Sequence, residues 1–297
     1  MVARSGFAGE RVPLSSLCAV LLAALCHAIW NLEAKRAANS RHFVWLYSAA
    51  SLLLWAPAVA YALWQPHLRF GPPQYLALCG TAVLHLLYSQ SLQAGYRAAD
   101  LSLVYPVARG SGPLLSFAGA VLLFGERPGI LALAGLLLIV AGIVLIADLH
   151  HALQRSAVPG LLWGALTGAC IAGYTLNDGW AVKILGVSPF LIDFAGNSFR
   201  VMALSRQAFG DRPELRREWR AYRRPVLTVA VLGPLGYLLV LFAMRRAPVS
   251  HVAPARELAT LVGTWFGARL LGERAAAQRL AGALCIVAGV VGLALSG

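Results

Sequence analysis

The chain has 297 residues, of which 59% are hydrophobic and only 12% are charged. Soluble proteins average about 45–50% apolar residues, so this composition excludes an ordinary soluble domain and predicts an integral membrane protein. A net charge of +13 at pH 7 is also typical of nucleic-acid-binding proteins, but so apolar a chain leaves little soluble surface for that partner. We therefore expect no nucleic-acid partner.

Apolar stretches of about 20 residues occur along the whole chain, and each is long enough to cross about 30 Å of hydrocarbon as an α-helix. Ten of them lie at residues 14–33, 43–64, 74–94, 101–123, 130–147, 159–180, 189–205, 226–244, 250–271 and 277–295. Asp193, Asn197 and Arg200 interrupt the seventh stretch. Arg4 and Arg11 precede the first stretch as in a signal peptide, but its length and the stretches that follow predict a retained helix. The sequence thus predicts an all-α polytopic membrane protein with ten transmembrane helices.

Two stretches of the chain repeat one another. Residues 94–127 read AGYRAADLSLVYPVARGSGPLLSFAGAVLLFGER, and residues 242–274 read FAMRRAPVSHVAPARELATLVGTWFGARLLGER. The matching positions are Arg97 with Arg245, Ser102 with Ser250, Pro106 with Pro254, Arg109 with Arg256, and the Gly-Glu-Arg triplets at both ends. A unit of five spans crosses the membrane an odd number of times, so its second copy enters from the opposite side. Residues 1–150 and 151–297 are therefore predicted to form two inverted five-helix repeats.

This repeat resembles the EamA-type transporters of the drug/metabolite transporter superfamily. The Pro-to-Glu block of each half carries the resemblance, as does HAIWNLEAK at residues 27–35, which is similar to the family pattern HAxWNxxxK. The resemblance covers nearly the whole chain. It implies a ten-helix bundle of two inverted repeats that moves a small metabolite by alternating access. We expect a secondary active transporter that exports a small organic metabolite, such as an amino acid or a similar, including anionic, compound. A flippase of a lipid-linked substrate is the alternative.

Proline and glycine interrupt the fourth and ninth spans. Pro106, Gly110 and Pro113 in the fourth span predict a bent helix, because proline removes a backbone hydrogen bond and glycine tolerates the irregularity. Pro254 predicts the same in the ninth span. Backbone groups freed in hydrocarbon survive only beside a protein-enclosed or watery cavity, and bends at matching positions of two halves indicate a transporter's binding site.

Arg109 and Arg256 lie beside these predicted bends at repeat-related positions. A charge inside the membrane costs several kcal/mol and usually faces a pathway or a partner. We predict that both arginines bind an anionic group of the substrate, most simply a carboxylate, through bidentate contacts. The alternatives are that the arginines reach the nearer membrane interface, or that Arg256 forms a local ion pair with Glu257.

Aromatic and polar residues complete the predicted substrate site. His27, Trp30 and Asn31 share one face of the first span at i, i+3 and i+4, and with Tyr105 and Tyr174 they would line a cavity wall. The alternative is that Trp30 and Asn31 only mark the membrane interface and a helix contact.

His27 and Asp178 are the candidates for proton coupling. Histidine titrates near neutral pH, although a lone buried histidine is more often structural. Asp178 lies where the second repeat matches the first-span motif, and the alternative for it is a solvent-facing position at the end of the span. Glu126 and Glu273 of the Gly-Glu-Arg triplets are instead expected to pair with neighbouring arginines or a helix N-terminus.

The densest basic segment reads RPELRREWRAYRR, residues 212–224. On a helix, Leu215, Trp219 and Tyr222 share one face with arginines around the rest, which predicts an interfacial helix among anionic phospholipid head groups near Arg212 to Arg224.

The side of the membrane that holds both termini carries seven basic loop residues and the other side fifteen, so the positive-inside rule places the termini outside. The family resemblance implies cytoplasmic termini, so the orientation stays open.

The sequence lacks the motifs of an enzyme or an ATP-driven pump. It contains no Gly-Lys-Ser/Thr phosphate loop, no persuasive Ser-His-Asp order and no metal-ligand spacing, so we expect no enzymatic activity, cofactor or metal site. Arginine-rich, lysine-poor usage points to a GC-rich bacterial genome, which would place the protein in the bacterial inner membrane. The substrate, the coupling ion and the oligomeric state, including a homodimer, stay open.

Overall fold

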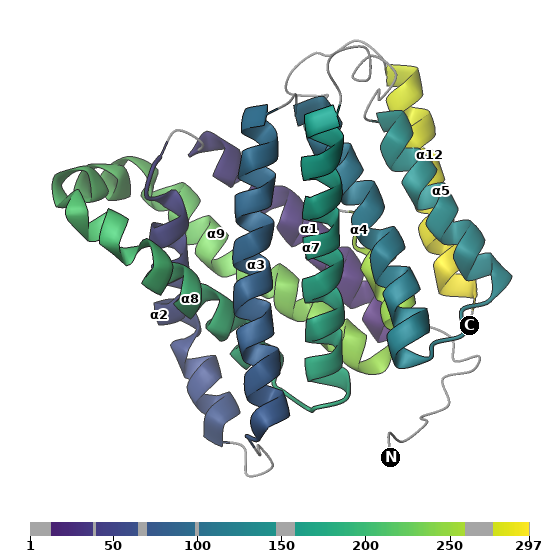
Figure 1. The fold of residues 1–297 in the computed structure, drawn as a ribbon, viewed down its shortest axis with the longest axis horizontal. Coiled ribbons are helices and arrows are strands. Elements are labelled where there is room, and N and C mark those ends of the chain that lie inside the picture. Colours follow the sequence, from purple (N-terminus) through teal and green to yellow (C-terminus); the bar gives the residue numbers. More distant parts are fainter. Residues whose placement is uncertain are drawn as a thin grey trace.

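The computed structural model describes residues 13–37, 40–64, 70–98, 101–146, 158–258 and 276–296. Within these ranges the chain is all-helical (Figure 1). The helices are α1 Leu14–Arg36, α2 Phe43–Trp64, α3 Pro72–Ala98, α4 Leu101–Phe124, α5 Ile130–Ile146, α7 Val158–Lys183, α8 Pro189–Gly210, α9 Arg212–Arg246, α10 Val249–Ala255 and α12 Ala276–Leu295. This confirms the predicted all-α fold.

Two helices differ in length from the predicted spans. Helix α9 joins the basic segment to the eighth span, and a kink at Tyr222, with φ −115° and ψ 16°, separates the two parts. Helix α10 ends at Ala255, whereas the ninth span was predicted over residues 250–271, and residues 259–275 lie outside the described ranges. Proline lacks the N–H that continues a helix, and here the N–H of Glu257 bonds to the Pro254 carbonyl at 2.9 Å, which tightens the last turn.

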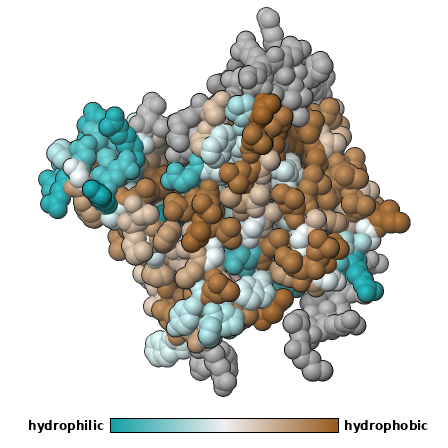
Figure 2. All heavy atoms as spheres, in the orientation of Figure 1, coloured by the Kyte–Doolittle hydropathy of each residue, from teal (hydrophilic) through white to brown (hydrophobic). Residues whose placement is uncertain are grey.

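The helix surfaces are those of a membrane protein. Among the described residues, the segments Phe43–Trp64, Val107–Phe124 and Arg212–Arg246 are each long and apolar enough to cross a membrane, and Leu14–Trp30, Ile130–Leu145 and Leu284–Leu295 are shorter apolar helices. Large apolar side chains point outward, including Leu122 and Ile130 at 81% and 89% exposure. Hydrophobic side chains cover the middle of the face in Figure 2. Such a surface fits an integral membrane protein.

The packing of the helices follows the repeat. Helices α1 to α5 correspond in chain order to α7, α8, α9, α10 and α12. If each helix is replaced by its counterpart in the other half, the contact of α1 with α9 becomes a contact of α7 with α3, which is also observed. In the same way, the contact of α2 with α9 becomes the observed contact of α8 with α3. Three further pairs join corresponding helices, namely α2–α8, α4–α10 and α5–α12. These pairs indicate a partial pseudo-twofold relation between the halves, whereas the extensive contact of α4 with α7 has no comparable counterpart between α1 and the described part of α10.

Helices α5 and α12 show this symmetry residue by residue. Gly135 and Gly142 of α5 match Gly282 and Gly289 of α12 in the repeat. The sequence IVAG ends at Gly142 in the first half and at Gly289 in the second. A Cβ atom at Gly135 would lie 2.5 Å from the Gly289 carbonyl oxygen, and one at Gly142 would lie 2.5 Å from the Gly282 carbonyl oxygen. Only glycine permits such close approach of two helix backbones, and small residues are typical of helix contacts in membranes.

Glu126 connects the two halves. It follows Gly125, whose φ of 67° ends α4 in the left-handed conformation that glycine favours. The Glu126 carboxylate accepts the N–H groups of Val249 at 2.8 Å and Ser250 at 2.9 Å, at the start of α10, and lies 3.4 Å from the Lys183 ammonium group. The expected contact with a helix N-terminus is thus present, although the helix belongs to the other repeat. Glu273 lies outside the described residues.

We expect the Gly142→Ala substitution to destabilise the protein. Its new methyl group would clash with the Gly282 backbone, which lies 2.5 Å away. Overpacking of this kind costs about 1–3 kcal/mol, so the thermal unfolding midpoint of the purified protein in detergent should fall. Gly233→Ala in α9 is the matched control, because the nearest atom to its new methyl group is a Val229 methyl at 3.9 Å. Equal midpoints for the two variants would contradict this close packing.

Candidate substrate site

The two repeat-related arginines lie in one buried cluster. Arg109 projects from α4, and its Nη1 lies 3.3 Å from the Oε1 atom of Glu257. Arg256 follows the last residue of α10 and is 6% exposed, while Glu257 is fully buried. The two guanidinium groups interact electrostatically with each other and Arg256 interacts with Glu257. The Glu257 carboxylate thus pairs with the partly buried Arg109 and directly follows the buried Arg256 in the chain.

Tyr174 of α7 is the third predicted residue in this cluster. Its hydroxyl oxygen lies 3.5 Å from the Nη2 atom of Arg256, and the Arg256 Cζ atom lies 5.7 Å from the centre of its ring. A cation over an aromatic face is attracted by the negative charge density of the ring. The structure thus places Arg256 against Tyr174 and within electrostatic range of Arg109, which pairs with Glu257.

Three aromatic residues that the sequence analysis did not assign to the site surround Tyr174. The His85 ring of α3 stacks on Tyr174 at 4.2 Å and 21°, and the Tyr237 ring of α9 lies edge-on to His85 at 5.4 Å and 86°. The Tyr88 ring meets Tyr174 edge-on at 5.8 Å and 79°. The sequence feature that could have identified them is the presence of polar aromatic residues in both the third and the eighth predicted spans, which correspond in the repeat.

Asp178 is fully buried one helical turn after Tyr174, rather than at a solvent-facing end of its span. The Tyr237 hydroxyl donates to its Oδ2 atom, and the Asn177 side chain donates to its Oδ1 atom at 2.9 Å. Asp178 also interacts electrostatically with Arg256. This predicted proton-coupling residue therefore belongs to the same polar cluster as the arginines.

His27, the other proton-coupling candidate, approaches the cluster from α1. Its Nδ1 atom is 2.8 Å from the Ala23 carbonyl oxygen, so Nδ1 carries the proton in that contact. The ring lies 5.8 Å from the Trp30 ring, and it is within electrostatic range of Arg109 and Arg256. Gly236 of α9 allows this approach, because a Cβ atom there would lie 2.8 Å from the His27 Nδ1. The Trp30 indole N–H is buried with no hydrogen-bond acceptor among the described residues.

The remaining predicted site residues are described only in part. The side chains of Asn31, Tyr105 and Pro106 lie outside the described part of the chain. Helix α4 runs from Leu101 to Phe124 and includes Gly110 and Pro113. The bend that the sequence predicts in this helix stays a prediction. In the second half the α-helix ends one residue after Pro254.

The polar residues that interrupt the seventh span form a ladder along one face of α8. The Asn197 amide donates to Asp193 Oδ2 at 2.9 Å, and Arg200 donates to Asn197 Oδ1 at 2.8 Å. The Arg200 Cζ atom lies 5.8 Å from the Tyr47 ring centre on α2, and Arg200 is within electrostatic range of His85. The ladder thus faces the bundle interior, and its i, i+4, i+7 spacing was the available sequence signal.

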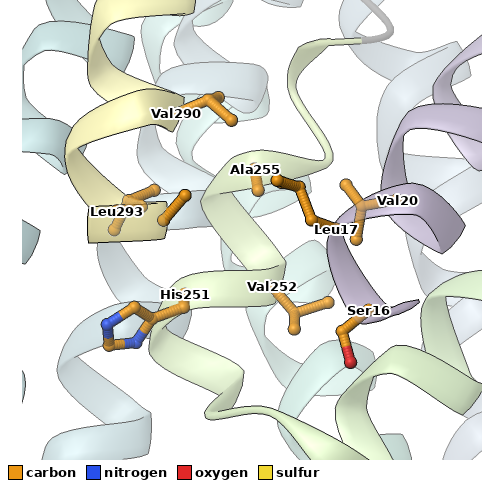
Figure 3. Close-up of a pocket in the computed structure, with 9 residues that line it drawn as sticks. Ser16, Leu17, Val20, His251, Val252, Ala255, Val290 and Leu293 are labelled. Atoms are coloured by element: carbon orange, nitrogen blue, oxygen red, sulfur yellow. The ribbon is translucent and has the colours of Figure 1, made fainter. Parts of the chain in front are cut away.

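An apolar pocket lies elsewhere, between α1, α10 and α12. Figure 3 shows Leu17 and Val20 facing Val252, with Val290 and Leu293 across from them. None of the buried charges lines this pocket. Within the described residues, no group of histidine, cysteine or acidic side chains is arranged to bind a metal ion.

We expect Glu257→Gln to destabilise the protein, because it removes the buried negative charge that faces Arg109. Breaking a buried ion pair from one side costs about 3–5 kcal/mol. The double variant Arg109→Gln, Glu257→Gln should lose less stability than the two single variants together, since it leaves no unbalanced charge in this pair. Unfolding midpoints in detergent for all four proteins give the coupling, and strictly additive effects would contradict the contact.

The sequence matches the EamA-like transporter family twice, over residues 14–147 and over residues 158–295. Among 29 solved chains that match the fold, one described as "Crystal structure of protein" has a TM-score of 0.71 and 17% sequence identity; the match covers 95% of this chain and 99% of that chain. At this identity the similarity shows the fold alone. No curated protein matches the chain.

Proposed function

Because this chain belongs to the EamA-like transporter family of the drug/metabolite transporter superfamily, we propose that it is a secondary active exporter of a small organic metabolite that carries a carboxylate. An amino acid is the simplest such compound. The protein would work by alternating access in the bacterial inner membrane. The observation that carries the proposal is the pair of repeat-related arginines, Arg256 buried and Arg109 partly buried, beside the buried Glu257 carboxylate.

The charges of the cluster favour an anionic group. With Asp178 protonated, Arg109 and Arg256 contribute two positive charges and the nearby Glu257 contributes one negative charge. A substrate carboxylate would balance the remaining positive charge, and a guanidinium group binds a carboxylate through two parallel hydrogen bonds. The aromatic rings of Tyr174 and His85 beside the arginines would contact the apolar part of a small organic molecule.

Asp178 gives this arrangement a means of proton coupling. The ammonium group of a bound amino acid would replace the proton on the buried Asp178 carboxyl group. The carboxylate of the same amino acid would bind the two arginines. Proton and substrate then compete for one site, which is the condition for exchanging an inward proton for an outward substrate. The Tyr237 and Asn177 hydrogen bonds hold the Asp178 carboxylate in position for both states.

A flippase for a lipid-linked substrate is the second candidate. The pocket between α1, α10 and α12 has an apolar lining that includes Leu17, Val252 and Leu293, but its free volume is about that of one water molecule, so an acyl chain would need these helices to separate. Transport of a water-soluble solute separates the two functions.

Untargeted mass spectrometry of medium and cell extract tests the transport proposal. Cells that express the wild type should accumulate a carboxylate metabolite outside, whereas Arg109→Gln and Arg256→Gln should reduce its export roughly 10- to 100-fold, since a charge-assisted hydrogen bond contributes about 1.5–3 kcal/mol. Arg246→Gln, which replaces an exposed arginine, is the matched control at equal membrane abundance. Arginine variants that export as well as the wild type would remove both residues from the site. No difference in any soluble compound would leave the flippase as the function to test.

Proteoliposomes identify the proton-coupling residue. Asp178→Asn should lose uptake driven by an imposed pH gradient and retain a part of substrate counterflow, because it can no longer exchange a proton. His27→Gln should retain the gradient dependence, since the His27 Nδ1 donates to the Ala23 carbonyl of its own helix and this contact gives the imidazole a structural role. The opposite pattern, with coupling lost in His27→Gln alone, would assign the proton to His27.

A further inference from the structure

One end of the bundle carries a dense set of exposed arginines. The first part of α9 contributes Arg212, Arg216, Arg217, Arg220, Arg223 and Arg224, all exposed. Arg36 of α1, Arg41 before α2 and Arg206 of α8 are exposed nearby, and we call these nine residues the basic face. Figures 1 and 2 show this part of α8 and α9 projecting from the bundle as a hydrophilic arm.

Glu218 attaches the arm to the protein. Its carboxylate accepts hydrogen bonds from the Ser40 hydroxyl at 2.8 Å and from the backbone N–H groups of Arg41 at 2.8 Å and His42 at 2.9 Å. Burial alone would raise the pKa of this carboxyl, but these hydrogen bonds outweigh burial and the pKa lies below its usual value. Glu218 therefore stays ionised at neutral pH, caps the N-terminus of α2 and fixes the arm in place.

The apolar side of the arm is already covered by protein. Leu215 and Tyr222 pack on a cluster that includes Phe43 and Val226, rather than facing lipid as the amphipathic pattern had suggested. Trp219 alone of the predicted apolar face is substantially exposed, at 41%. The arm thus cannot bind a membrane by inserting an apolar stripe, and what it presents is positive charge.

The acidic residues of this end leave most of that charge uncompensated. Glu33 pairs with Arg36, and Glu214 pairs with Arg217. Asp211 accepts the N–H of Glu214 as the cap of α9, and the Glu218 carboxylate is 4% exposed beneath the arm. The kink at Tyr222 then leads directly into the apolar part of α9 that enters the membrane, so the arm lies at the level of the lipid head groups.

We propose that the basic face is a binding site for anionic phospholipids, whose phosphate groups its arginines contact. Guanidinium groups bind phosphate oxygens through paired, charge-assisted hydrogen bonds. Membrane lipids are present at this surface at high local concentration, which favours them over nucleic acid or an acidic protein as the occupant. The site is independent of the transport function proposed for the bundle interior.

Lipid quenching of Trp219 fluorescence tests the site directly. The full-length protein is reconstituted in vesicles of phosphatidylcholine mixed with phosphatidylglycerol, with bromine on the acyl chains of one lipid or the other. The chain has 8 tryptophans, so the contribution of Trp219 is the difference between wild type and Trp219→Phe. We expect brominated phosphatidylglycerol to quench Trp219 preferentially at low salt, and this preference to weaken at high salt.

Arginine variants decide what causes the preference. Arg216→Gln with Arg220→Gln should lower it about fivefold for each arginine removed. Arg245→Gln with Arg246→Gln, two exposed residues at the opposite end of the same helix, should leave it unchanged. Unchanged unfolding midpoints in both double variants show that the fold is intact. Equal quenching by both lipids, a preference that survives in the Arg216, Arg220 variant, or displacement of the lipid by an added oligonucleotide or acidic peptide would overturn the proposal.

Discussion

An ion buried in an apolar bundle is costly unless another group balances it, and this constraint orders the interior of the protein. Asp178, Arg256 and Glu257 are at most 6% exposed. Each meets a partner from another helix, namely Tyr237, Tyr174 and Arg109. These contacts join α4, α7, α9 and the end of α10 at one place. Under the proposed function, the atoms that hold these helices together would also bind the charged solute.

The periphery of the bundle is held by different means. Helix α5 contains no charged residue, and it meets α12 through glycines whose backbones touch. Glu126 caps α10 across the boundary between the repeats, and Glu218 caps α2 beneath the basic arm. These contacts satisfy backbone groups or exclude voids.

The sequence predicted the features that depend on local pattern. Apolar length gave the helices, and matching residues gave the repeat and hence the grouping of Arg109 with Arg256. The packing of His85, Tyr174 and Tyr237 could not be predicted in the same way, because it depends on contacts between α3, α7 and α9 that no motif records. The basic segment shows a second limit. Periodicity identified an apolar face with Leu215 and Tyr222, but it does not say whether protein or lipid covers that face.

We propose that Arg109 and Arg256 recognise a carboxylate, and ligand-induced stabilisation of the purified protein tests this recognition most directly. A ligand that binds only the folded state raises the unfolding midpoint. A panel of small carboxylic acids, amino acids among them, should include compounds that raise the midpoint of the wild type, while the corresponding amides do not. The shift should vanish in the Arg109→Gln and Arg256→Gln variants. Equal stabilisation by acid and amide, or a shift that persists without the arginines, would contradict the account.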